Sequence, residues 1–155
     1  MPKTKFQEII FTIMMVFMMV YFMICYNIAL NVGSMTNQVF LDAFHELVIM
    51  GPIAFIFDFF IIGHLAKMKA FQIVNLEKDN PFHLVIAISI VSIILMCPCM
   101  SLAATLLFKN AGSQIIAIWL QTTVMNFPMA FFLQLCFAGP IVRFVFGKIF
   151  NENRA

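Results

Sequence analysis

Asp58 is the residue whose type and position most clearly indicate chemistry. It lies about midway along the apolar segment Leu47–Ala66. An ionisable group at that depth costs about 2.5–3.5 kcal/mol on insertion scales, so it usually faces the protein interior or a wet cavity. Low-dielectric surroundings favour the neutral carboxyl group, which could then load and release a proton near neutral pH. The sequence therefore predicts a proton or cation site at Asp58. The alternative is a carboxyl group that holds helices together, against Gln134 or Ser92.

His45 and Glu46 directly precede the same apolar segment. Histidine is the side chain that titrates near neutral pH, so the two residues could form a gate or a proton relay at the mouth of the span. The alternative is an ordinary interfacial pair, with Glu46 favoured near a helix N-terminus by the helix dipole.

Amide side chains lie at several points of the apolar segments. Asn27 is near the end of the first segment, Gln121 and Asn126 are in the first half of the last one, and Gln134 follows them. Such groups can line a polar pathway or form hydrogen bonds between helices. Both interpretations stay open.

Cys97 and Cys99 flank Pro98 in a Cys-Pro-Cys string with a methionine on either side. Thiolate and thioether ligands select soft ions such as Cu(I), so this string is a candidate metal site. The alternative is packing, because Met and Cys are also soft apolar residues and a mid-helix proline is tolerated in membranes.

The composition places the chain among membrane proteins. Of 155 residues, 63% are hydrophobic and only 10% charged, with 20 phenylalanines and a net charge of +2. Soluble domains are nearer to half apolar and a quarter charged. The small net charge argues against nucleic-acid binding. The sequence shows no nucleophilic triad, phosphate-binding loop or zinc-spaced histidine set, so we expect neither enzymatic activity nor a cofactor.

Four segments are long and apolar enough to cross a bilayer as helices. A polar connection over Asn31–Phe44 is expected outside the membrane, and Gly139-Pro140 is expected to kink or end the last segment and leave an interfacial tail. The predicted spans are residues 9–30, 47–66, 84–108 and 115–140.

The second and fourth spans resemble each other. Pro52, Ala54, Phe55 and Gly63 recur as proline, alanine, phenylalanine and glycine at one constant offset along the chain, and the same offset places Asp58 on Gln134. We therefore predict two tandem helical hairpins (residues 1–73 and 82–155) joined by a linker (74–81). Each hairpin has two spans, so both run the same way through the membrane, as parallel repeats. Gly63 and Gly139 at one shared level predict a close approach of helices.

Basic residues predict the orientation. Eight of them fall on one side of the predicted spans and only Lys109 on the other, so both termini are expected in the cytoplasm. The eight are Lys3, Lys5, Lys67, Lys69, Lys78, Arg143, Lys148 and Arg154.

The strings KTKFQEIIFTIMMVFMMVYFMICYNIALN and ELVIMGPIAFIFDFFIIGHLAKMKAF, with LMCPCMSLAATLLF and NFPMAFFLQLCFAGPIVRFVF, resemble the bacterial domain-of-unknown-function 2798 family. Its domain is a pair of transmembrane helices, and the resemblance covers nearly the whole chain as two tandem copies. It brings no known activity, and it implies a bacterial cytoplasmic membrane protein.

A shorter similarity is to the proteobacterial antimicrobial compound efflux family, which also consists of two tandem two-helix units. It rests on Tyr26-Asn27 and Phe44-His45-Glu46. That family has an acidic residue inside its first span, whereas the first span here has only Glu8, at its beginning. The similarity implies proton-coupled export.

The sequence thus predicts an all-α membrane protein of four spans, and homodimerisation is expected because four short helices enclose little volume. The leading functional hypothesis is a small proton-coupled secondary transporter that exports a hydrophobic or cationic compound, with Asp58 as the coupling group. The alternatives are a non-transporting module that binds a lipid or another membrane protein, and transport or binding of Cu(I).

Overall fold

The computed structural model describes residues 4–74, 81–110 and 112–151, and this part of the chain consists of helices joined by short loops. Four helical runs in it are long and apolar enough to cross a membrane: Lys5–Val32, Asn37–Ile73, Phe82–Phe108 and Gly112–Phe150. The successive elements are α1 (Lys5–Val32), α2 (Asn37–Ile56), η1 (Phe57–Ile62), α3 (Gly63–Ile73), α4 (Pro81–Phe108), η2 (Gly112–Gln114), α5 (Ile115–Phe132), η3 (Leu133–Ala138) and α6 (Gly139–Asn151).

The boundaries of α1 follow from local chemistry. Thr4 precedes it in an extended conformation, and its hydroxyl group accepts a hydrogen bond from the backbone N–H of Gln7, as an N-cap residue does. Gly33 ends the helix at φ +80° and donates its N–H to the carbonyl of Ala29. A glycine is favoured there because the left-handed conformation costs it little.

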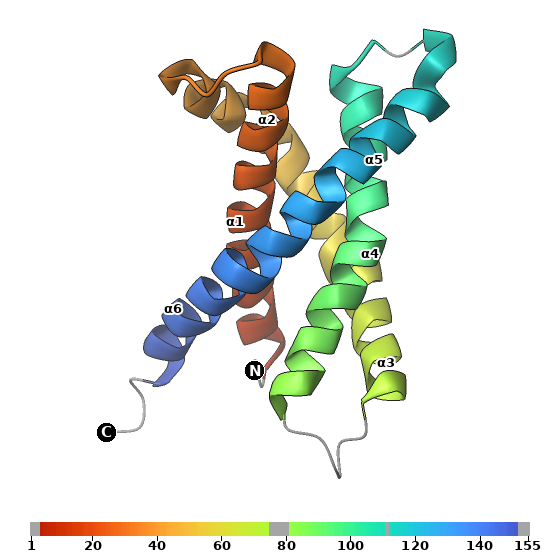
Figure 1. Cartoon of the computed structure of the whole chain (residues 1–155). Helices are drawn as coiled ribbons and strands as arrows, with labels where there is room; N and C mark the ends of the chain where they lie inside the picture. Colours follow the sequence, from red (N-terminus) through yellow and green to blue (C-terminus); the bar gives the residue numbers. More distant parts are fainter. Residues whose placement is uncertain (1–3, 75–80, 111, 152–155) are drawn as a thin grey trace.

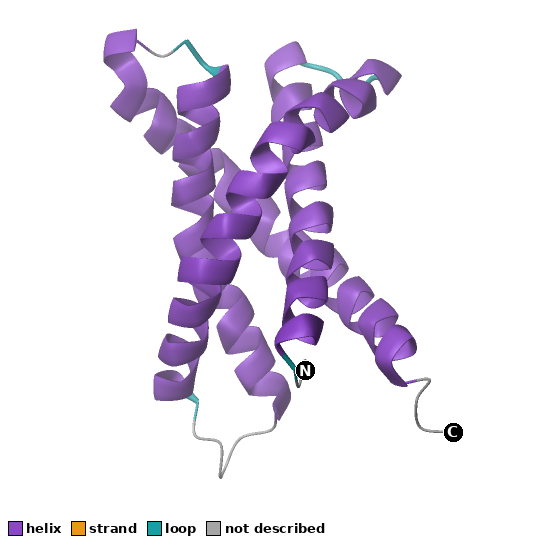
Figure 2. Cartoon of the chain, turned by 180° about the vertical axis from the view of Figure 1, so that it is seen from behind, coloured by secondary structure: helices purple, strands orange, loops and turns teal. Residues whose placement is uncertain are grey.

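The predicted architecture of two parallel-related hairpins is confirmed. In Figure 1, α1 and α4 stand upright, while α2–α3 and α5–α6 run obliquely behind and in front of them. The view from behind in Figure 2 repeats this outline, with α2–α3 now in front. A half turn about the vertical axis therefore exchanges the hairpins. The repeat offset seen in the sequence relates both ends of α1 to those of α4, and both ends of η1 to those of η3.

Each long oblique span contains one turn of π-helix at the same place. η1 and η3 each have six residues, and in each the next glycine donates its N–H to a carbonyl five residues earlier. A Cβ on Gly63 would lie 2.6 Å from the carbonyl oxygen of Asp58, and a Cβ on Gly139 would lie 2.5 Å from that of Gln134. A side chain at either glycine would therefore clash with a backbone carbonyl oxygen of the same span, so glycine is required by the π turn itself. The prediction that they mark an approach between two helices is wrong.

Two predicted boundaries are also wrong. The polar connection expected over Asn31–Phe44 is limited to Gly33–Thr36, because α2 begins at Asn37. Of the kink or end expected at Gly139-Pro140, the end is wrong: the last span continues as α6, since proline is tolerated within membrane helices. Most of the predicted linker 74–81 lies outside the described residues.

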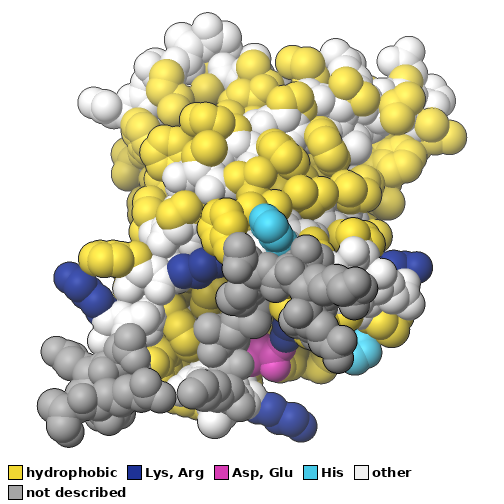
Figure 3. Space-filling view, turned by 60° about the horizontal axis from the view of Figure 1, so that its bottom comes forward, with side chains coloured by type: hydrophobic (Ala, Val, Ile, Leu, Met, Phe, Trp, Pro, Cys, Tyr) yellow, Lys and Arg dark blue, Asp and Glu magenta, His cyan; other side chains and the backbone are white. Residues whose placement is uncertain are grey.

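The surface divides into an apolar band and a basic end. We call the end where α1 and α4 begin the basic end, and the opposite end the loop end. Figure 3 shows Lys and Arg side chains around the basic end and mainly apolar side chains above it. Phenylalanines such as Phe60 and Phe144 are about two-thirds exposed on the band. Such a surface suits lipid and is uncommon in soluble proteins.

Candidate functional site

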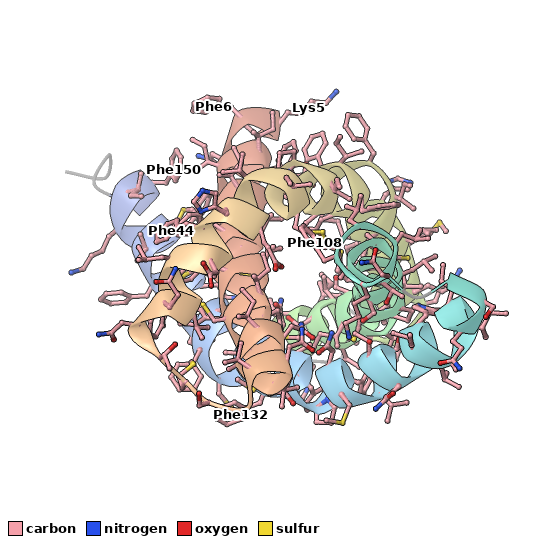
Figure 4. The ribbon with its side chains drawn as sticks, turned by 90° about the horizontal axis from the view of Figure 1, so that it is seen from above. Lys5, Phe6, Phe44, Phe108, Phe132 and Phe150 are labelled. Atoms are coloured by element: carbon pink, nitrogen blue, oxygen red, sulfur yellow. The ribbon has the colours of Figure 1, made fainter. Side chains whose placement is uncertain are left out.

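A cavity of about 460 Å³ lies between the helices and is lined by residues of all four spans. Figure 4 shows the spans surrounding a common centre, with the labelled Phe6 and Phe132 on the outer side. Along α1 the lining runs from Glu8 to Asn27, about 28 Å at 1.5 Å per residue. The cavity therefore extends through most of the bundle, and its volume is in the range of small-molecule sites.

Asp58 lines the middle part of this cavity. It is partly buried in η1, between Glu46 and Lys67 of the same span, which also line the cavity. Among the described residues, its carboxyl group makes neither a hydrogen bond nor an ion pair. Gln134 and Ser92, the two partners considered for it, line the cavity as well but are not hydrogen-bonded to it. The carboxyl group is thus available to a proton or a ligand in the cavity.

Gln134 occupies the corresponding place in the second hairpin. It is the second residue of η3, as Asp58 is of η1, and it is only 8% exposed while lining the cavity. Two equivalent π turns therefore present one carboxyl group and one amide to the same volume.

Only one of the two residues predicted to form a gate, His45 and Glu46, lies at the cavity. Glu46 lines the loop end of the cavity, whereas His45 is exposed and is not among the lining residues. Consecutive helical residues point about 100° apart, so only one of them can face inward. Asn27 lines the same end and donates its amide N–H to the carbonyl of Met23, at 2.9 Å.

Of the two remaining amide residues, Asn126 and Gln121, only Asn126 lies at the cavity. Asn126 is 5% exposed, lines the cavity, and has its Nδ2 3.4 Å from Ser101 Oγ on α4; its buried Oδ1 has no hydrogen-bond partner among the described residues. Gln121 is exposed and does not line the cavity. Its predicted place in a polar pathway is therefore not supported.

The Cys-Pro-Cys string does not present its two thiols together. Cys97 lines the cavity, with Sγ 3.7 Å from the carbonyl oxygen of Thr123, while Cys99 is outside the lining. Residues two apart on a helix do not face each other. Within the described ranges, no group of three His, Cys, Asp or Glu side chains is arranged to hold a metal ion.

The basic end of the cavity contains charged residues that the sequence analysis did not assign to a site. Glu8 of α1 forms an ion pair with Lys67 of α3. Arg143 of α6, expected in an interfacial tail, lines the cavity and donates from Nη2 to Ser89 Oγ, at 3.2 Å. Lys67 and Arg143 are separated by the repeat offset that relates Asp58 to Gln134. The sequence therefore contained a signal for these residues: the repeat offset, applied to the basic residues, aligns Lys67 with Arg143.

The arrangement defines a class: a four-span membrane protein of two tandem hairpins that enclose a cavity with polar ends and one central carboxyl group. The sequence comparisons agree with it. Residues 4–74 and 82–150 each match the profile described as domain of unknown function (DUF2798), and the chain therefore belongs to that family.

A curated relative covers almost the same length. The chain is 34% identical over 156 residues to "Uncharacterized protein YybC" of Bacillus subtilis (strain 168), an alignment that covers 96% of this chain and 94% of the relative. No solved structure matches the chain with significance.

Proposed function

We propose that this membrane protein is a proton-coupled secondary transporter that exports a hydrophobic or cationic compound. The observation that carries the proposal is the carboxyl group of Asp58, which has no hydrogen-bond or ion-pair partner among the described residues and lies at the middle of a cavity of about 460 Å³ lined by both hairpins. A carboxyl group in such a place can exchange a proton for a cationic ligand, because either the proton or the ligand neutralises the negative charge of the carboxylate. The proposal includes neither catalysis nor a cofactor.

The lining also supports a ligand that is mainly apolar. Methionines of α1, α2 and α4 face the cavity, including Met19, Met50 and Met96. Methionine is flexible and polarisable, so a methionine surface can adapt to ligands of different shape. Two similar hairpins surround one cavity, and this arrangement is compatible with alternating access, in which one repeat moves relative to the other around the binding site.

The test is transport in proteoliposomes with an imposed pH gradient and tetraphenylphosphonium as the probe. Asp58→Asn keeps the size of the side chain and removes its charge, so proton-driven flux should fall at least tenfold while the protein remains folded. Asp42→Asn is the matched control, because Asp42 is exposed near the start of α2 and bonded to Gln38. Flux in the Asp58→Asn protein equal to that of the control would contradict the assignment.

A second variant moves the carboxyl group instead of removing it. Asp58→Gln combined with Gln134→Asp places it in the equivalent π turn, and we expect partial recovery of flux relative to Asp58→Gln alone. If the parent protein transports no tested cation, the non-transporting lipid- or protein-binding module becomes the better hypothesis.

A further inference from the structure

The two hairpins place a cation at equivalent positions, but they neutralise it differently. Lys67 forms an ion pair with Glu8 of its own hairpin. Arg143 forms a hydrogen bond with the neutral hydroxyl of Ser89 of its own hairpin. Within the described residues, no carboxylate lies within ion-pair distance of Arg143. One cation of the pair therefore lacks a counter-charge from this part of the chain.

The position of the Arg143 side chain is determined by its surroundings. Its two terminal nitrogens lie 3.5 and 3.6 Å from where a Cβ on Gly139 would be, so the guanidinium group folds back over the π-turn glycine. From there Nη2 reaches Ser89 on α4, whose hydroxyl group donates in turn to the carbonyl of Val85, at 3.0 Å. The guanidinium group is thus held at the cavity wall by one of its five N–H donors.

A partly buried charge without a counter-charge is unfavourable unless a ligand or solvent compensates for it. Guanidinium binds carboxylate and phosphate groups through two parallel hydrogen bonds, which a lysine ammonium cannot reproduce. Beyond the basic end, the cavity continues past methionines of α1 and α4, such as Met15 and Met96, toward Asn27. The anion-binding group is therefore followed by an apolar wall.

We propose that the basic end of the cavity is a binding site for the anionic group of a single-chain amphiphile, with Arg143 as its ligand and the alkyl chain along the methionine wall. The anionic group is a carboxylate or a phosphate monoester. A volume of about 460 Å³ is sufficient for one alkyl chain.

The proposed site shares the cavity with Asp58 but takes its anion-binding group from Arg143, so it does not depend on the transport proposal. Among the residues that line the cavity at the basic end, the partly exposed Glu8–Lys67 pair contributes no net charge, so Arg143 gives this end of the cavity its positive charge. A compound that contacts both Asp58 and Arg143 would need a cationic and an anionic group.

The experiment uses the full chain in nanodiscs of zwitterionic phosphatidylcholine, which presents no anionic lipid. Saturable binding of radiolabelled dodecanoate and dodecyl phosphate is measured by scintillation proximity, with dodecyltrimethylammonium as the cationic comparison. Arg143→Gln should weaken binding of the two anions at least tenfold, and Arg143→Lys should weaken it less. Lys148→Gln is the matched control, because Lys148 is exposed on the same helix and lies over the ring of Phe144.

The result expected is anion binding that depends on Arg143, is insensitive to Lys148→Gln, and persists in Asp58→Asn. The ratio of dodecanoate to dodecyl phosphate affinity identifies the headgroup. No saturable binding of either anion to the parent protein would overturn the proposal. So would an equal loss in Lys148→Gln, which would indicate surface charge, or unchanged binding in a folded Arg143→Gln protein. Persistent anion binding without cation flux would refute the transport proposal alone.

Discussion

Adding one methyl group at Gly63 tests whether the π turn is built into the sequence. The Cβ of Gly63→Ala would lie 2.6 Å from the carbonyl oxygen of Asp58, and that of Gly139→Ala 2.5 Å from the carbonyl oxygen of Gln134. Outside its own and adjacent residues and the helix backbone within four residues, a Cβ atom essentially never lies closer than 3.0 Å to another heavy atom. The backbone must therefore move by several tenths of an ångström at either position, and slightly further at Gly139 than at Gly63. Each carbonyl accepts the bond that closes its π turn, so it cannot move without weakening that bond.

The magnitude follows from two opposing effects. Overpacking that shifts backbone costs about 1–3 kcal/mol, while replacing a helical glycine by alanine gains about 1 kcal/mol of helix propensity. Gly147 isolates the second effect, because it is helical and a Cβ there would meet nothing within 4 Å. We therefore expect Gly147→Ala to be neutral or stabilising. Gly63→Ala and Gly139→Ala should be less stable than Gly147→Ala by about 1–3 kcal/mol.

The assay is reversible unfolding in mixed micelles with increasing sodium dodecyl sulfate. Trp119 is the only tryptophan, and its indole N–H donates to the carbonyl of Pro98 on α4, at 2.9 Å, so its fluorescence reports the packing of α5 on α4. Circular dichroism gives the helix content in parallel. Equal free energies of unfolding for Gly63→Ala and Gly147→Ala would refute the reasoning, because the contact would then relax without cost.

Three further predictions concern the charges, the thiols and the orientation. Because the Glu8–Lys67 pair is partly exposed, a double-mutant cycle of Glu8→Gln and Lys67→Gln should give a coupling free energy of about 0.2–1 kcal/mol; a value near zero would show that the pair is not formed. Since Cys97 and Cys99 do not face each other, replacing both by serine should leave the Cu(I) affinity of the purified protein unchanged, and a large loss by competition titration would restore the metal hypothesis. Fluorescent-protein fusions at either terminus should fluoresce in the cytoplasm, as the basic residues indicate, and dark fusions would reverse the predicted orientation.

Much of the fold could be predicted because the relevant signals are local. Hydropathy identified four spans, since a helix in lipid must be apolar over its own length. The repeated Pro52, Ala54 and Gly63 identified the duplication and aligned Asp58 with Gln134. The alignment could not show why the glycine recurs. A π turn depends on hydrogen bonds between residues five apart, and no composition signal distinguishes it from a regular helix.

The membrane class, the number of spans, the parallel repeat and the presence of one acid inside a span were determined by the sequence alone, because each is a property of a segment or of a spacing. Which side chains share the cavity was decided by the tertiary structure. Asp58, Glu46 and Asn27 line it, as do Glu8 and Arg143 from segments that seemed peripheral. His45, Gln121 and Cys99 do not, although their residue types are equally suitable for a site. In lipid both faces of a span can be apolar, so the packing of the helices against one another chooses the inward face.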